Sequence, residues 1–75
     1  SFAKIAKTIT IDISDKSVLP DIKKALSALP AGYTRVVLNI HSEGKTVTLA
    51  LKTGVELGPT TAKDLTALGT KVAIE

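Results

Sequence analysis

The sequence of 75 residues contains no cysteine, no methionine and no tryptophan, and its single histidine is His41. Without cysteine, the chain has neither a disulfide framework nor a thiolate metal site. No apolar run approaches the ~20 residues of a membrane span, and the first residues lack the basic and apolar order of a secretory signal. These absences favour a soluble protein with no membrane partner.

Aromatic side chains are nearly absent as well, because Phe2 and Tyr33 are the only two. The core must therefore be built from Ile, Val, Leu and Ala. Apolar residues make up 44% of the chain and charged residues 23%, which is ordinary for a globular domain and unlike a disordered segment. The length predicts one small domain over residues 1–75. Because the chain begins with Ser1 rather than Met, we expect it to be excised from a longer protein.

Several segments alternate apolar and polar residues, which is the pattern of a half-buried strand. Residues 7–13 place Ile9, Ile11 and Ile13 on one face. The two segments 35–41 and 45–52 flank a short loop that contains Gly44, so they predict a β-hairpin. Residues 55–57 predict a short extra strand, and residues 71–75 a last strand.

Two other segments have the spacing of amphipathic helices. Residues 18–29 predict the first helix, with Ser17 as its N-cap and Pro20 in its first turn. The second, about ten residues long, begins at Pro59 and ends at Gly69. The predicted fold class is α+β: a two-layer sandwich in βαββαβ order, with a ferredoxin-like antiparallel sheet and both helices on one face.

The sequence offers little for catalysis. His41 is the only imidazole, and its neighbour Ser42 would point to the opposite face of a strand, so we interpret His41 as an exposed residue beside a loop. Asp12 and Asp15 flank a strand-to-helix connection, where Asp serves turns and caps. Neither the metal-ligand spacings nor the glycine-rich phosphate loops are present. We therefore expect no catalytic, metal-binding or cofactor-binding residues, and no enzymatic activity in this domain.

Nucleic acid is an alternative partner, because the net charge is +3 and the isoelectric point is about 9.4. The predicted strand order is that of the RNA-recognition module, which stacks bases on aromatic residues of its central strands. Here those strands contain no aromatic residue, and the lysines are dispersed. The second hypothesis is therefore a small basic module that binds either nucleic acid, weakly, or a small ligand.

A series of short motifs resembles the C-terminal domain of the alpha subunit of bacterial DNA polymerase III, the replicative polymerase. The motifs are IDISDKS, IKKALSALP with the exit Pro30-Ala31-Gly32, TRVVLNI, GKTVTL, GVEL, LTALG and KVAI. Together they cover nearly the whole chain. The short, threonine-rich start of the second helix, Gly58-Pro59-Thr60-Thr61, departs from the family pattern.

The resemblance implies a non-catalytic domain at the C-terminal end of a cytoplasmic DNA polymerase, a transferase whose catalytic carboxylates lie far upstream. In that family the domain helps the alpha subunit to dock onto the tau subunit of the clamp loader. The implied function is protein–protein attachment during DNA replication. No clamp-binding pentapeptide of the Q-x-x-L-F kind occurs here, so sliding-clamp binding is not implied.

Three residues are candidates for a protein contact: Tyr33, Arg35 and Phe2. Tyr and Arg are enriched at interface hot spots, and we expect Tyr33 in the loop that leaves the first helix, with Arg35 nearby. Two simpler interpretations stay open, since Tyr33 could cover the end of that helix and Phe2 could pack against a preceding domain or fray. The uncovered sheet face, with its threonines, is a further candidate surface.

Overall fold

The computed structural model describes residues 7–75, so the candidate Phe2 lies outside the described part. Its elements follow the predicted order, with one short 3-10 turn added before the first helix. They are β1 (Lys7–Ile13), η2 (Lys16–Val18), α1 (Leu19–Ser27), β2 (Ala31–Ser42), β3 (Lys45–Ala50), α2 (Thr61–Ala67) and β4 (Lys71–Ile74). Among the described residues, no helix has the length and apolar character that a membrane crossing needs.

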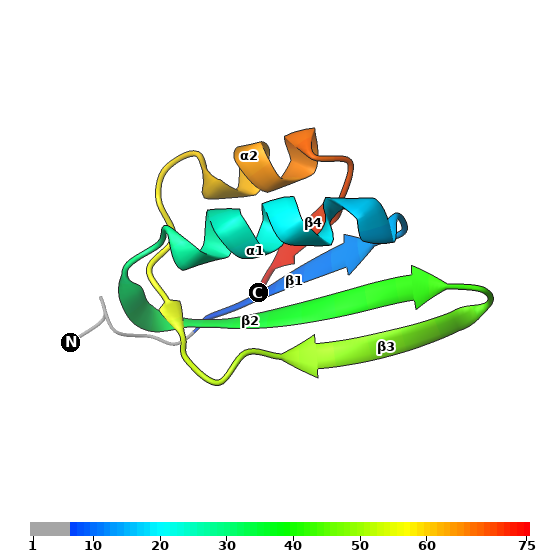
Figure 1. Ribbon diagram of the computed structural model, residues 1–75. Coiled ribbons are helices and arrows are strands. Elements are labelled where there is room, and N and C mark those ends of the chain that lie inside the picture. The colour runs from blue at the N-terminus through cyan, green and yellow to red at the C-terminus, as the bar shows by residue number, and fades with distance from the viewer. Residues whose placement is uncertain (1–6) are drawn as a thin grey trace.

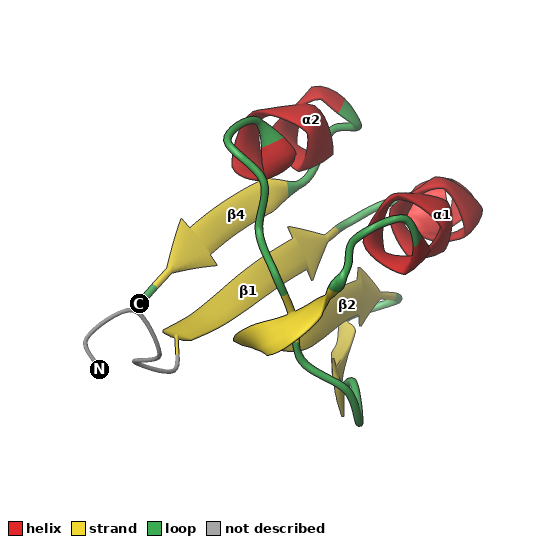
Figure 2. Cartoon of the chain, turned by 90° about the vertical axis from the view of Figure 1, so that its left-hand side faces the viewer, coloured by secondary structure: helices red, strands yellow, loops and turns green. Residues whose placement is uncertain are grey.

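The four strands form one sheet in the order β3-β2-β1-β4, and both helices lie on the same face of it (Figures 1 and 2). The α+β class, the βαββαβ order and the two layers are therefore confirmed. In these features the fold is broadly ferredoxin-like. Within residues 7–75, one face of the sheet is covered by helices and the other face is left open.

The sheet departs from the expected antiparallel one in a single pairing, so it is mixed. β1 pairs directly with β2 in parallel, with Ile9 opposite Val36 and Ile11 opposite Leu38. In the split βαβ unit of a ferredoxin-like sheet, another strand separates these two. Here β3 instead pairs antiparallel with the outer side of β2 and forms the edge of the sheet. Lysines at both ends of the segment 45–52 suit an edge strand, where charge discourages further pairing.

The predicted hairpin is confirmed, although its loop is shorter than predicted. β2 continues to Ser42 and β3 begins at Lys45, so the loop consists of Glu43 and Gly44. Both residues have positive φ angles, 52° and 75°, as a two-residue type I′ turn requires. This turn fixes the register that places His41 opposite Thr46.

The core is aliphatic, as expected, and lies between the sheet and the helices. The inward-facing row of β1 is completely buried, and β2, α1, α2 and the loop after β3 supply the rest. Its members are Ile9, Ile11, Ile13, Ile22, Leu26, Val36, Leu38, Val55 and Leu65. Burying each such side chain contributes about 1.5–3 kcal/mol, so the β1 row is the largest single contribution.

Both helix starts differ from their predictions in detail. Ser17 is not an N-cap, because its backbone N–H donates to the Asp15 carboxylate at 2.9 Å and it lies inside the 3-10 turn. α1 then begins at Leu19, with Pro20 in its first turn as predicted. α2 begins at Thr61, two residues after Pro59, and the predicted strand at 55–57 is reduced to bridges from Val55 to β2.

Candidate functional site

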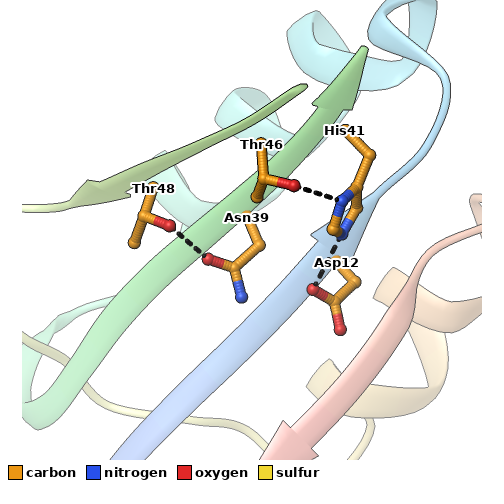
Figure 3. A network of polar contacts seen from close by, with 5 residues as sticks. All are labelled: Asp12, Asn39, His41, Thr46 and Thr48. Carbon is orange, nitrogen blue, oxygen red and sulfur yellow. Dashed lines mark hydrogen bonds and ion pairs between the residues drawn. The ribbon is translucent and has the colours of Figure 1, made fainter. Parts of the chain in front are cut away.

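The open face of the sheet carries a network of polar side chains at one end of β1, β2 and β3 (Figure 3). His41 connects two neighbouring strands, because its Nδ1 lies 2.9 Å from the Thr46 hydroxyl and its Nε2 lies 3.3 Å from the Asp12 carboxylate. Beside it, the Thr48 hydroxyl donates to the Asn39 side-chain oxygen at 2.8 Å. His41 is exposed and close to the loop, as expected, but its two partners were not predicted.

The arrangement of carboxylate, imidazole and hydroxyl has the connectivity of a catalytic triad. Catalysis of that kind also needs donors that stabilise a developing oxyanion. The open depression beside Thr46, about 650 Å³, is lined by two carboxylates and two lysines, so it has no excess of positive charge for an oxyanion; these residues are Asp15, Glu43, Lys16 and Lys45. Hydrogen bonds from the backbone and side chain of Ser17 hold the pKa of Asp15 below its ordinary value, so that carboxylate stays ionised. We interpret the His41 network as a structural feature whose hydrogen bonds link β2 to β1 and β3.

Tyr33 and Arg35 lie near the other end of the open face. Both belong to β2, which corrects the expected loop placement of Tyr33 and agrees with the strand predicted from Arg35 onward. Together with Lys7 and Lys52 they line an open depression of about 350 Å³, called here the basic depression. Tyr33 is 60% exposed. The structure thus brings Arg35 and Tyr33 together with two lysines that the sequence analysis did not select.

The largest departure from the predicted burial is on β3. Val47, Leu49 and the following Leu51 lie on the helix side of the sheet, yet they are 54%, 48% and 38% exposed. β3 is the edge strand furthest from α2, and neither helix covers it (Figure 1). These three residues form an uncovered apolar row next to the core.

Between this row and α1 lies an open, mainly apolar groove of about 530 Å³, called here the docking groove. Its buried lining residues are Leu26, Leu38 and Val55, and its more exposed apolar lining residues are Leu29, Leu49 and Leu51. Among the described residues that line it, the charged ones are Lys23 and Lys52.

The docking groove and the basic depression are adjacent, because both are lined by Leu51, Lys52 and Gly54. At this junction the backbone at Gly54 approaches β2 closely, and only glycine fits there, since a Cβ at position 54 would lie 2.5 Å from the carbonyl oxygen of Gly32. One continuous surface therefore runs from the aliphatic side of α1, around the end of the hairpin, to Arg35 and Lys7. The lysines at both ends of 45–52 are the sequence signal from which an edge strand could have been predicted, and the sequence analysis did not use it.

Comparison with known proteins gives no family assignment, since neither a family model nor a curated protein matches the chain. In the described residues 7–75, no group of three or more histidine or acidic side chains gathers as metal ligands would. The docking groove, with the basic depression beside it, is the surface whose chemistry most clearly calls for a partner.

Proposed function

We propose that this chain is a non-catalytic attachment domain that binds another protein. The uncovered apolar row of Val47, Leu49 and Leu51, beside the docking groove, carries the proposal. Exposed apolar surface that adjoins a core is costly in water and is typical of interaction sites. Following the sequence resemblance, the parent protein is the cytoplasmic alpha subunit of a bacterial DNA polymerase III, and the partner is the clamp-loader tau subunit.

The positions of the motifs support this proposal. The exit Pro30-Ala31-Gly32 leads from α1 into β2, the GKTVTL motif covers the start of β3, and KVAI is β4. The motifs therefore fall in order along the elements of one fold, although only KVAI spans a whole element. Their order along the chain is what supports the proposal.

The area available sets the strength of the contact. Full burial of a leucine or valine contributes about 1.5–3 kcal/mol, so covering three roughly half-exposed side chains contributes on the order of 3 kcal/mol. That amount corresponds to about a hundredfold in affinity, before the costs of association. The docking groove alone thus supports a weak contact, which suits a domain that helps a larger chain to dock.

Calorimetric titration of the chain with the tau subunit, at two salt concentrations, tests the proposal. We expect saturable binding that weakens only a few-fold at the higher salt, because apolar contacts respond little to screening. A matched titration with short single-stranded DNA is the control, since phosphate-driven binding falls steeply with salt. Absence of tau binding at both salt concentrations would refute the proposed partner.

The basic depression favours a second candidate function, a small basic module that binds nucleic acid. Lys7, Arg35 and Lys52 gather there beside the exposed Tyr33. Such cations suit a single-stranded phosphate backbone, and an aromatic ring among them suits stacking with a base. This function predicts DNA binding that is lost on replacing Arg35 and Lys52 and is unchanged by Leu49→Gln. The same DNA titration, run on these variants, distinguishes the two functions.

A further inference from the structure

We infer that the docking groove and the basic depression together bind one amphipathic helix of a partner protein, whose aliphatic stripe is followed by carboxylates. The inference rests on the proposed attachment function and specifies the chemistry of the partner segment. The aliphatic stripe would lie on the helix side of the sheet, between α1 and the row of Val47, Leu49 and Leu51. The carboxylates that follow it would continue around the end of the hairpin to Lys52 and then to Arg35 on the open face.

The direction of the uncovered row favours a helix as the occupant. The register places Leu49 opposite the buried Leu38, so the row faces the helix side of the sheet. α1 and α2 lie over the other strands of that face, while β3 has no helix above it (Figures 1 and 2). A third helix beside α1 would complete the layer and bury the row against the docking groove. A strand added at the edge of β3 would leave the helix-side surfaces of Leu49 and Leu51 exposed.

The charges specify the flanks of that helix. Lys23 and Lys52 line the docking groove, and Lys7, Arg35 and Lys52 line the basic depression, while the described lining of both contains no carboxylate side chain. An acidic segment placed there would gain Coulomb attraction along its length, whereas a basic one would be repelled. Because Lys52 belongs to both surfaces, the carboxylates should follow the aliphatic stripe directly.

A second copy of this chain is a poor occupant. In an antiparallel, two-fold pairing of the segments 45–52, Lys45 of one copy would lie opposite Lys52 of the other, which is unfavourable. Neither described helix supplies an acidic flank, since α1 carries Asp21 with two lysines and α2 carries Asp64 with Lys63. The described helices of a second copy therefore do not supply the complementary segment.

Selection from a displayed library of random 18-residue peptides tests the inference without presupposing a partner. The chain is the bait, and the enriched peptides are then titrated against variants. Leu49→Gln removes apolar surface from the docking groove, and Ile74→Gln is its matched control, because Ile74 is 45% exposed on β4 at the opposite edge of the sheet. Lys52→Glu reverses the shared charge, and Lys63→Glu on α2 is the control for it.

We expect enriched peptides with aliphatic residues at helical spacing and an acidic end. Leu49→Gln and Lys52→Glu should weaken their binding at least tenfold and fivefold, while both controls stay within twofold. The inference would be overturned if the enriched peptides were basic, if Leu49→Gln did not affect their binding, or if no peptide were enriched. Binding of single-stranded DNA by the same residues would also overturn it. A parallel titration with the tau subunit distinguishes the proposed binding site from the proposed partner. If tau binds and Leu49→Gln leaves that binding unchanged, the docking groove is refuted as the site. If peptides bind and tau does not, tau alone is refuted as the partner.

Discussion

Leu38 and Leu49 lie opposite each other on β2 and β3 and face the same side of the sheet, but their burial differs sharply. Leu38 is 3% exposed, whereas Leu49 is 48% exposed. Replacing Leu38 with alanine should cost about 3 kcal/mol of unfolding free energy, since buried Leu→Ala changes cost ~2–5 kcal/mol. Replacing Leu49 should cost about 1 kcal/mol, because half of its surface is already in water and no closed cavity forms.

Urea denaturation followed by far-ultraviolet circular dichroism measures both losses in a chain that lacks tryptophan. With a slope of about 1 kcal/mol per molar urea, the midpoints should fall by about 3 M and about 1 M. A domain of this length has roughly 4–11 kcal/mol of stability, so an unfolded Leu38→Ala chain would agree with the same ordering. Equal midpoint shifts at unchanged slopes would refute the reasoning, because they would mean that the β3 row is buried in solution.

Two further variants test the local structure that frames the site. Asp15→Ala should lower the melting temperature at neutral pH and make the melting temperature less sensitive to acid. Hydrogen bonds from Ser17 lower the pKa of Asp15 in the folded state. The Asp15 carboxylate therefore stabilises the fold above its unfolded pKa, and this stabilisation disappears as the pH falls through the folded pKa. Melting curves between pH 7 and about pH 3 check this, and an unchanged pH profile would contradict it. Gly54→Ala should cost about 1–3 kcal/mol and lower the melting temperature by about 5–20 °C, because the new Cβ would meet the Gly32 carbonyl oxygen at 2.5 Å. Gly58→Ala is the matched control, since its Cβ meets only the Thr61 hydroxyl at 3.3 Å, and equal losses in the two variants would contradict the prediction.

The elements of this fold could be predicted from the sequence because their signals are local. Alternation identified β1 and the hairpin, and the apolar spacing with Pro20 identified α1. Apart from the hairpin, strand neighbours could not be predicted in this way, since the parallel pairing of β1 with β2 depends on contacts between distant segments. The choice between Ser17 and Asp15 as a cap also depended on the exact course of the turn, which periodicity does not specify.

The candidate site was less predictable than the fold. Arg35 and Tyr33 were selected from residue type alone, but their neighbours Lys7 and Lys52 come from other segments and meet them only in the sheet. The alternation of β3 predicted a buried face, and this face is exposed. Periodicity shows which residues share a face, but it does not show whether another element covers that face. The exposure of Leu49 follows from β3 being an edge strand that neither helix covers.

The measurement that tests the central claim most directly is nuclear magnetic resonance of the isotope-labelled chain during titration with the tau subunit. The leucine methyl and backbone amide signals report on each surface separately. We predict that the largest shifts occur at Leu26, Leu49 and Leu51, followed by Lys52 and Arg35, while Asn39 and His41 on the open face change little. Shifts that centre on the His41 network, or no shifts at saturating tau, would contradict the assignment of the docking groove as the attachment surface.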